Sequence, residues 1–564
     1  GRQACPWRTG SLMFRTKSGK PWPYEPGSSM QSAWTTLICG RPGSGKSVLL
    51  NALNLGTILS STSYGADLPM ITIIDIGPSS SGLISLIREA LPPELQHLAI
   101  SKRMSTHIDN SINVFDTPLG ARFPTTQDEN FLINFLSIVC TDGVTPIGSE
   151  MTGLIRAIIH EAYQQHAPGG SAAKIYNYGV SPLVDQALKE IGYTPRTSPQ
   201  ELWWTIVDVL TTKQKVVEAN IAQRFAVPTM LSLTSILSAS DSIKNTYEDT
   251  MVPNSKETVI KAFQRMMSEV TREYPFLANE TRLDISDARI ISFDLKDVTA
   301  QGESASAVKQ TAIMYMLARQ IGTRSFFREE DDFKAMYKAG KIPKMYVPYH
   351  IHTIRANRQV WKCVCYDEYH RAAKSPSVKS QVFLDSREGR KFKMMLNVIS
   401  QLPQDFDVDL MAQATGFIAC ENLTEAGIEH VRKSFQVKET DREILTRNLN
   451  GVIPGEGSVL WSAFLVKGYG QFSQELMLTL GPIELWAFST TATDTSIRQL
   501  IYEKLGPGEA RRVLARRFPS GSAEKAILAR IARIENEAER TGDNARANVI
   551  NEFIDMLVQD SRAR

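Results

Sequence analysis

A glycine-rich loop near the start of the chain has the residue types and the spacing of a phosphate-binding loop. Gly40 is followed by four residues and then by Gly45, Lys46 and Ser47, which matches the pattern G-x-x-x-x-G-K-[ST]. The apolar run before the loop predicts a strand and the spacing after it predicts a helix, so backbone N–H groups would face phosphate oxygens at a helix N-terminus. We expect Lys46 to neutralise the β- and γ-phosphates of ATP and Ser47 to bind Mg²⁺. The predicted nucleotide-binding residues are Gly40, Pro42, Gly43, Ser44, Gly45, Lys46, Ser47 and Val48.

A pair of adjacent carboxylates, Asp367 and Glu368, is the second candidate for chemistry. The pair ends an apolar segment that begins at Cys363 and has the composition of a strand. Phosphoryl transfer needs an acidic residue that holds Mg²⁺ and a group that positions the attacking water. We assign Asp367 to the metal and Glu368 to polarising the water. The alternative is an exposed pair of charges at the end of a strand, and the phosphate loop favours the catalytic interpretation.

Two further side chains are candidates for the reaction. Gln401 ends a predicted strand, where its amide could hydrogen-bond the attacking water or the γ-phosphate. Arg390 lies between the acidic strand and this one, where an arginine could reach the nucleotide of a neighbouring subunit. The alternatives are a solvated glutamine before the turn at Pro403 and a solvated basic surface. The predicted catalytic residues are Glu368, Lys46, Gln401 and Arg390.

The elements that must position these residues alternate between strands and helices. Segments with the apolar pattern of strands occur at 34–39, 70–75, 289–295, 363–368, 394–401, 416–420, 458–466, 471–480 and 484–488. The runs 458–466 and 471–480 flank a glycine-bearing loop and predict a hairpin. Apolar residues at a period of 3.6 dominate from about 120 to 285 and indicate an all-helical insertion. The pattern therefore predicts an α/β fold with a parallel sheet, interrupted by helices and followed by a charged helical tail.

The composition is that of a folded globular protein. Of 564 residues, 42% are hydrophobic and 22% are charged, which is far from the composition of disordered chains. A formal net charge of +3 is nearly neutral for this length and argues against a surface dedicated to coating nucleic acid. The six cysteines lie mostly in apolar runs, so we expect reduced thiols, and no apolar stretch is long enough to predict a membrane-spanning helix.

The order of these motifs resembles that of the large ATPases of conjugation and type IV secretion. Besides the phosphate loop and the acidic pair, the shared elements are Ile74–Ser79, Ile112–Asp116, Arg390–Lys391 and Ser400–Gln401. The stretches Gly19–Pro26 and Gly481–Phe488 look most like the type IVB branch, which includes the DotO/IcmB and TraU proteins. After the acidic pair the family commonly has Trp, whereas this chain has Tyr369 and His370.

The resemblance implies a RecA-like ATPase core of the additional-strand type with a large all-helical insertion and a helical C-terminal tail. The divisions that we predict are 1–119 for the first part of the core, 120–285 for the insertion, 286–505 for the second part with the acidic strand and hairpin, and 506–564 for the tail. It also implies a cytoplasmic hexamer, peripheral at the inner membrane of a Gram-negative bacterium, with the inner-membrane secretion complex and other secretion ATPases as partners. Because the chain begins with Gly1 and reaches the phosphate loop within 50 residues, we expect it to be a fragment.

The leading hypothesis is a motor that hydrolyses ATP to drive substrate transfer or assembly of a type IV (IVB) secretion or conjugation machine, with protein or DNA as cargo. A DNA-translocating coupling protein or helicase-like ATPase is the first alternative. A nucleotide-gated assembly scaffold with slow turnover is the second, although a pure binder would have little need of Glu368.

Overall fold

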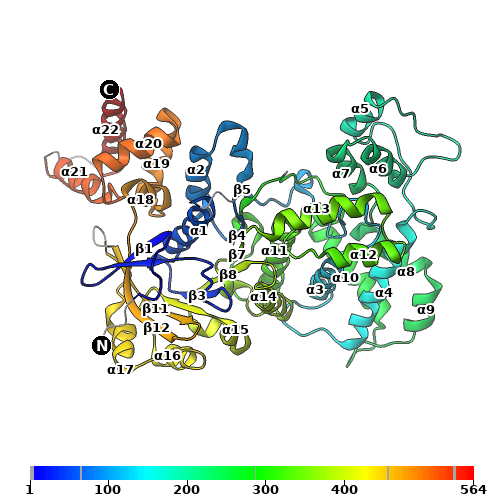
Figure 1. Cartoon of the computed structure of the whole chain (residues 1–564), viewed down its shortest axis with the longest axis horizontal. Helices are drawn as coiled ribbons and strands as arrows, with labels where there is room; N and C mark the ends of the chain where they lie inside the picture. The colour runs from blue at the N-terminus through cyan, green and yellow to red at the C-terminus, as the bar shows by residue number, and fades with distance from the viewer. Residues whose placement is uncertain (1–4, 64–66, 286, 454–456, 538–541, 564) are drawn as a thin grey trace.

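A mixed β-sheet runs through the centre of the molecule (Figure 1). The computed structural model describes residues 5–63, 67–285, 287–453, 457–537 and 542–563. Its strands are β1 (Leu12–Thr16), β2 (Pro21–Tyr24), β3 (Thr35–Cys39), β4 (Met70–Asp75), β5 (Ala99–Arg103), β6 (Ile290–Asp294), β7 (Lys362–Tyr366), β8 (Met394–Ser400), β9 (Gly416–Ala419), β10 (Val452–Ile453), β11 (Gly457–Val466) and β12 (Gly470–Leu478).

The strand order explains how the phosphate loop and the acidic pair meet. The parallel part of the sheet has the order β9-β3-β8-β7-β4-β6-β5, and β11, β12, β1 and β2 extend it antiparallel beyond β9. β8 stands between β3, which leads into the phosphate loop, and β7, which ends at the acidic pair. This order confirms the predicted α/β core with an additional strand, and it brings the carboxyl ends of β3, β8, β7 and β4 to one edge.

Both faces of the parallel sheet are buried, as its continuous apolar strands require. Leu37 of β3 and Val364 of β7 face a core shared with α11 (Ala305–Thr323) and α14 (Pro376–Glu388). The next residue in β3, Ile38, faces the opposite core, which includes side chains of α1 (Lys46–Ser63) and α2 (Ser81–Ala90). The strands therefore form a fixed platform for the loops at their ends.

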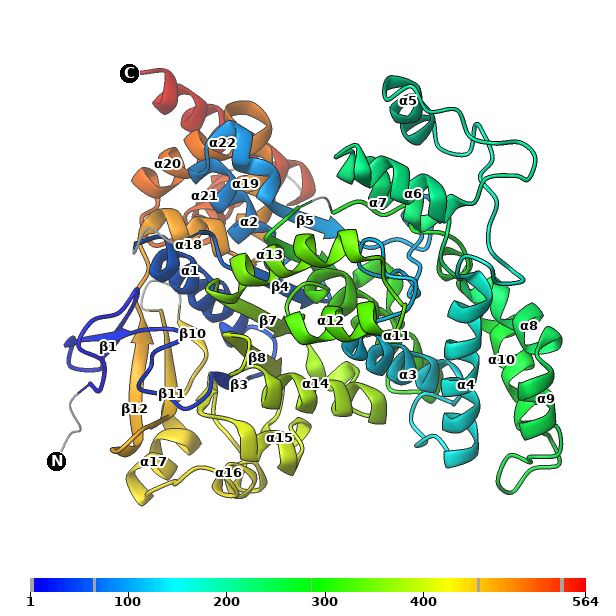
Figure 2. The same cartoon turned by 45° about the vertical axis from the view of Figure 1, so that its right-hand side comes forward.

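Helices fill the long connection between the parallel neighbours β5 and β6, which we call the helical region (Figures 1 and 2). They are α3 (Thr126–Val139), α4 (Ser149–His166), α5 (Pro182–Glu190), α6 (Trp203–Thr212), α7 (Val216–Arg224), α8 (Met230–Ala239), α9 (Asp241–Tyr247) and α10 (Val259–Glu273). α12 (Glu330–Lys338) and α13 (Val347–Arg358), from much later in the chain, share a hydrophobic cluster with α5, α6 and α7. Two separate segments of the chain thus build this part of the molecule.

Shorter helices complete the connections between strands. They are α15 (Val408–Gln413), α16 (Glu425–Arg432), α17 (Glu439–Glu443), η1 (Pro93–Leu98), η2 (Ile108–Asn110), η3 (Pro275–Leu277), η4 (Lys296–Val298), η5 (Lys344–Tyr346), η6 (Tyr369–Arg371), η7 (Pro403–Asp405) and η8 (Ile444–Asn448). Within the described residues, every helix is too short or too polar to cross a lipid bilayer.

The C-terminal helices form a separate cluster beside α2 (Figure 1). They are α18 (Pro482–Phe488), α19 (Ala492–Leu505), α20 (Pro507–Arg517), α21 (Glu524–Glu537) and α22 (Gly542–Arg562). The prediction of a strand at 484–488 is wrong, because these residues form α18. Pro482 occupies the first turn of this helix, where proline is well tolerated, and Trp486 is buried in the cluster.

Four strands, β1, β2, β5 and β10, were not predicted from the sequence. β5 has an exposed, charged end, and β2 contains Pro21 and Pro23. Prolines are confined to edge strands, and β2 is such a strand. Aromatic packing stabilises this edge, because Trp22 of β2 contacts both Phe14 of the neighbouring β1 and Phe464 of β11.

Candidate active site

The phosphate loop connects β3 to the first turn of α1. Gly43 and Gly45 adopt positive φ angles of 84° and 92°, which a side chain would strain, and these conformations turn the backbone between strand and helix. The loop is anchored to the neighbouring strand by the Gly40 N–H, which donates to the Ser400 carbonyl oxygen at 3.2 Å. Ser44 Oγ is buried and has no hydrogen-bond partner among the described residues. A phosphate bound at this helix N-terminus could accept hydrogen bonds from the backbone N–H groups of the first turn and from the Ser44 hydroxyl.

Lys46 and Glu368 form an ion pair across the sheet edge. Lys46 Nζ lies 3.2 Å from Glu368 Oε1, and the two side chains are 5% and 25% exposed. A buried ammonium needs an opposite charge, and here the candidate water-polarising residue supplies it. The fold therefore brings together two candidate site residues that are 322 positions apart in the chain.

The backbone at Glu368 is unusual for a residue with a side chain. Its φ of 52° and ψ of 35° lie in the left-handed region, which costs an L-residue roughly 1–2 kcal/mol. The conformation is held locally, because the Glu368 N–H donates to Asp367 Oδ1 at 2.8 Å and the Glu368 carbonyl accepts from Arg371 N–H at 3.0 Å. Strain of this kind is common where a side chain must be aimed at a reacting group.

Asp367 and Asp75 add two carboxyl groups to the same edge. Asp367 directly follows β7, and Asp75 is the last residue of the neighbouring strand β4. The Asp367 N–H donates to the Ile74 carbonyl oxygen at 2.9 Å. Burial and the nearby Glu368 carboxylate raise the pKa of Asp367 to about 6, although Lys46 opposes the shift. Burial and Asp367 raise the pKa of Asp75 well above its usual value. Two crowded, desolvated carboxyl groups favour the binding of a cation, which could lie between these groups and a bound phosphate.

The residues present fit Mg²⁺ bound together with a nucleotide. Ser47, in the first turn of α1, and Asp367 offer the hydroxyl and carboxylate oxygens that this hard cation prefers. Within the described residues there is no cluster of three or more His, Cys, Asp or Glu side chains arranged to hold a metal.

Gln401 lies beside the start of the phosphate loop. It directly follows β8, whose last residue, Ser400, pairs in register with Cys39 of β3. The carbonyl of Ser400 accepts from Gly40, so Gln401 leaves the sheet at the edge that carries Lys46 and Glu368. The side chain is half-buried there.

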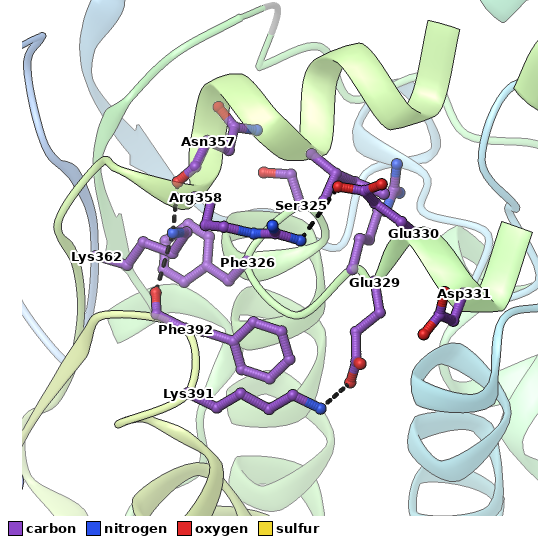
Figure 3. A pocket seen from close by; sticks show the side chains of 12 residues that line it. Ser325, Phe326, Glu329, Glu330, Asp331, Asn357, Arg358, Lys362, Lys391 and Phe392 are labelled. Atoms are coloured by element: carbon purple, nitrogen blue, oxygen red, sulfur yellow. Dashed lines mark hydrogen bonds and ion pairs between the residues drawn. The ribbon is translucent and has the colours of Figure 1, made fainter. Parts of the chain in front are cut away.

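Arg390 lies at the opposite end of the same strands. It is exposed in the turn between α14 and β8, and the length of β8 separates this turn from Gln401 by roughly 20 Å. A cavity of about 370 Å³ opens nearby, at the amino ends of β7 and β8 (Figure 3). Ion pairs cross its rim, among them Lys391 with Glu329 and Arg358 with Glu330. Within one chain, Arg390 therefore does not join the other predicted catalytic residues.

A second cavity, of about 590 Å³, lies against the outer side of the phosphate loop and was missed by the sequence analysis. Its lining residues are Arg41, Pro42, Gly43, Ser44, Glu421, Asn422, Leu423, Thr424, Leu449, Asn450, Gly451 and Val452. A Cβ atom at Gly45 would lie 3.0 Å from Val452 Cγ2, so this late segment of the chain directly covers the loop. The Asn450-Gly451 turn signal marks the segment in the sequence, but nothing local assigns it to the loop.

The fold is that of the RecA-like P-loop class, with the additional strand β8 between the strand that leads into the loop and the strand that ends at the acidic pair. No protein-family model matches the chain, and no curated protein matches it in sequence.

Among solved structures, VirB4 of Thermoanaerobacter pseudethanolicus is similar with a TM-score of 0.49 and 14% identity, over 86% of this chain and 100% of that one. The bacterial conjugative coupling protein TrwBdeltaN70 in its unbound form gives 0.39 and 11%, over 83% and 89%. The plasmid coupling protein TrwB in complex with ADP and Mg²⁺ gives 0.38 and 11%, over 85% and 97%.

Proposed function

We propose that this chain is an ATPase motor that energises substrate transfer or assembly of a type IV secretion or conjugation machine, of the type IVB branch. The observation that carries the catalytic part is the contact between Lys46 and Glu368 at the edge where Asp367 and Gln401 also lie. A phosphate-binding lysine, a metal-binding carboxylate and a second carboxylate at one edge are the groups that ATP hydrolysis requires.

In this proposal the phosphates of ATP lie on the loop from Gly40 to Val48, and Lys46 moves from Glu368 to the β- and γ-phosphates. Ser47 and Asp367 would hold Mg²⁺, which would supply positive charge against the charge that develops on the phosphates. Glu368, released from Lys46, orients and polarises the attacking water, and Gln401 contributes a hydrogen bond to the water or to the γ-phosphate. The cavity beside Arg41 and Asn450 has the volume of a ligand site and receives the nucleoside.

The biological role and the assembly rest on the order of motifs that resembles the secretion and conjugation ATPases. We propose a homohexamer that acts at the cytoplasmic side of the inner membrane, where it docks on the secretion complex together with other secretion ATPases. In this proposal Arg390, which lies at the opposite end of the strands from the phosphate loop, serves the nucleotide of a neighbouring subunit.

Release of phosphate from ATP by the purified chain tests the proposal. We expect Mg²⁺-dependent hydrolysis that rises more than linearly with protein concentration and is abolished by EDTA. Tight nucleotide binding without turnover at any concentration would contradict the motor and favour the scaffold. Hydrolysis stimulated by DNA, with a steep dependence on salt, would instead indicate a DNA translocase.

A further inference from the structure

The Glu368 carboxylate has a second neighbour besides Lys46. His370 Nε2 lies 3.6 Å from Glu368 Oε2, while Lys46 Nζ contacts the other carboxylate oxygen, Oε1, at 3.2 Å. The carboxylate thus stands between an ammonium and an imidazole. His370 is not among the site residues predicted from the sequence.

The position of His370 is fixed by the end of the neighbouring strand. Its backbone N–H donates to Ser400 Oγ at 3.0 Å, and Ser400 Oγ in turn donates to Asp405 Oδ2 at 2.7 Å. Ser400 is the last residue of β8 and precedes Gln401. These bonds tie the turn that carries the histidine to the strand that carries the proposed γ-phosphate sensor.

The ring is oriented so that Nε2 faces the carboxylate. Nδ1 is buried and has no hydrogen-bond partner among the described residues. The charged groups around the ring are Glu368 beside it, Asp405 of η7, Lys46 of α1, Arg371 and Glu303. Burial is the largest influence and lowers the pKa of His370, although Glu368 and Asp405 raise it, so the imidazole is neutral at pH 7. A neutral imidazole protonated on Nε2 would donate to Glu368 after an approach of about 0.5 Å.

We propose that His370 is a positioning residue, which holds the Glu368 carboxylate for water activation once the phosphates of ATP have drawn Lys46 away. This inference rests on the proposed function. Without the imidazole, the carboxylate would lose both neighbours when nucleotide binds, and the left-handed backbone at Glu368 would not by itself fix the side chain. His370 therefore affects the chemical step and not the binding of ATP.

The kinetic test compares His370→Ala, His370→Gln and the matched control His352→Ala, whose histidine is exposed on α13. We expect His370→Ala to lower kcat by about tenfold or more while KM for ATP stays within about twofold, as for a misplaced catalytic group. His370→Gln keeps an N–H donor near the position of Nε2 and should recover most of the loss. An unchanged kcat in His370→Ala overturns the proposal. So does an equal loss in both variants with a lowered thermal midpoint, which would mean a purely structural histidine.

A titration without nucleotide tests the contact itself. The Cε1–H signal of His370, assigned by its loss in His370→Gln, reports the pKa of the ring. Because the Glu368 carboxylate raises this pKa and Lys46 lowers it, Glu368→Gln should lower the pKa and Lys46→Met should raise it. An unchanged pKa in Glu368→Gln overturns the contact. If the wild type fails to hydrolyse ATP but the titration behaves as expected, the proposed function fails and the contact between the two residues stands.

Discussion

The two ends of the parallel strands differ in how their charges are balanced. At the carboxyl ends, Glu368 pairs with the buried ammonium of Lys46, Asp367 and Asp75 lie near Glu368, and the pKa values of both aspartates are raised. At the amino ends, acidic and basic side chains pair with one another at the rim of a cavity (Figure 3). At the carboxyl ends the carboxyl groups outnumber the ammonium, whereas at the amino ends Arg355, Arg358 and Lys391 are each paired with a carboxylate.

This difference shows which end is built for a ligand. Ion pairs between exposed side chains contribute little and leave no demand for a partner. Crowded carboxylates beside a phosphate-binding loop are unfavourable alone and become favourable when a cation and a phosphate arrive together. Perturbed groups gathered at one edge of an open α/β sheet are typical of a functional site.

We expect the largest difference between the two ends of the parallel strands when a lysine is removed from each, Lys46 at the carboxyl ends and Lys391 at the amino ends. Lys46→Ala should abolish ATP binding and hydrolysis, because it removes the charge that neutralises the phosphates. Lys391→Ala, which breaks an exposed pair with Glu329 at the amino ends, should leave both unchanged. Equilibrium binding of a fluorescent ATP analogue and a phosphate-release assay measure this difference. Normal ATP binding by the Lys46 variant would contradict the assignment of this loop as the phosphate-binding site.

The second prediction concerns Arg390, at the amino ends of the strands, and its proposed contribution to the nucleotide site of a neighbouring subunit. Arg390→Ala should bind ATP normally and lose turnover by about 10³-fold, the effect of an arginine supplied in trans. Mixing this variant with Glu368→Gln should restore part of the activity, because an intact Glu368 then faces an intact Arg390. Unchanged turnover of Arg390→Ala would return this residue to a solvated surface charge.

Gln401→Ala should have a smaller effect on the carboxyl end. The amide contributes one hydrogen bond to the water or the γ-phosphate, so its loss should lower kcat by about 10²-fold with little change in KM. Single-turnover hydrolysis separates the chemical step from binding. An increase in KM alone would assign Gln401 to nucleotide binding instead.

The smallest prediction concerns Lys362, a buried cation at the amino ends. Its ammonium donates to the carbonyl oxygens of Asn357, Val360 and Phe392, and burial lowers its pKa from 10.5 to about 8. Between these two values the unfolded chain binds more protons than the folded one, so this group makes stability rise with pH, on the order of 1 kcal/mol per unit. In denaturant titrations from pH 8 to 10.5, Lys362→Met should lack this rise. An equal slope in wild type and variant would contradict the shifted pKa.

Much of the carboxyl end could be predicted from the sequence because its signals are local. The phosphate loop is a contiguous motif, and Asp367, Glu368 and Gln401 each follow an apolar strand, so a parallel sheet brings them to one edge. The prediction of a strand at 484–488, directly after the hairpin, was wrong. A short apolar run of this kind fits a strand or a helix equally until its packing is known.

Other features of the site depend on tertiary structure. The segment that covers the phosphate loop, around Asn450, comes from a distant part of the chain and carries no nucleotide-binding motif. Arg390 was placed between two strands in sequence, but only the direction of β8 shows that it lies at the amino end. The contact of His370 with Glu368 arises from the left-handed turn at Glu368, which no residue type announces.

The most direct test of the central claim, that the carboxyl ends of β3, β8 and β7 form an ATP hydrolysis site, is Glu368→Gln. ATP labelled at the γ-phosphate is incubated with this variant and with Lys46→Ala, and bound ATP and released phosphate are measured in the same sample. Because the substitution keeps Asp367 and the shape of the side chain, we predict that Glu368→Gln retains ATP in unhydrolysed form, whereas Lys46→Ala retains none. Wild-type rates of phosphate release by Glu368→Gln, or a loss of ATP binding equal to that of Lys46→Ala, would contradict the account.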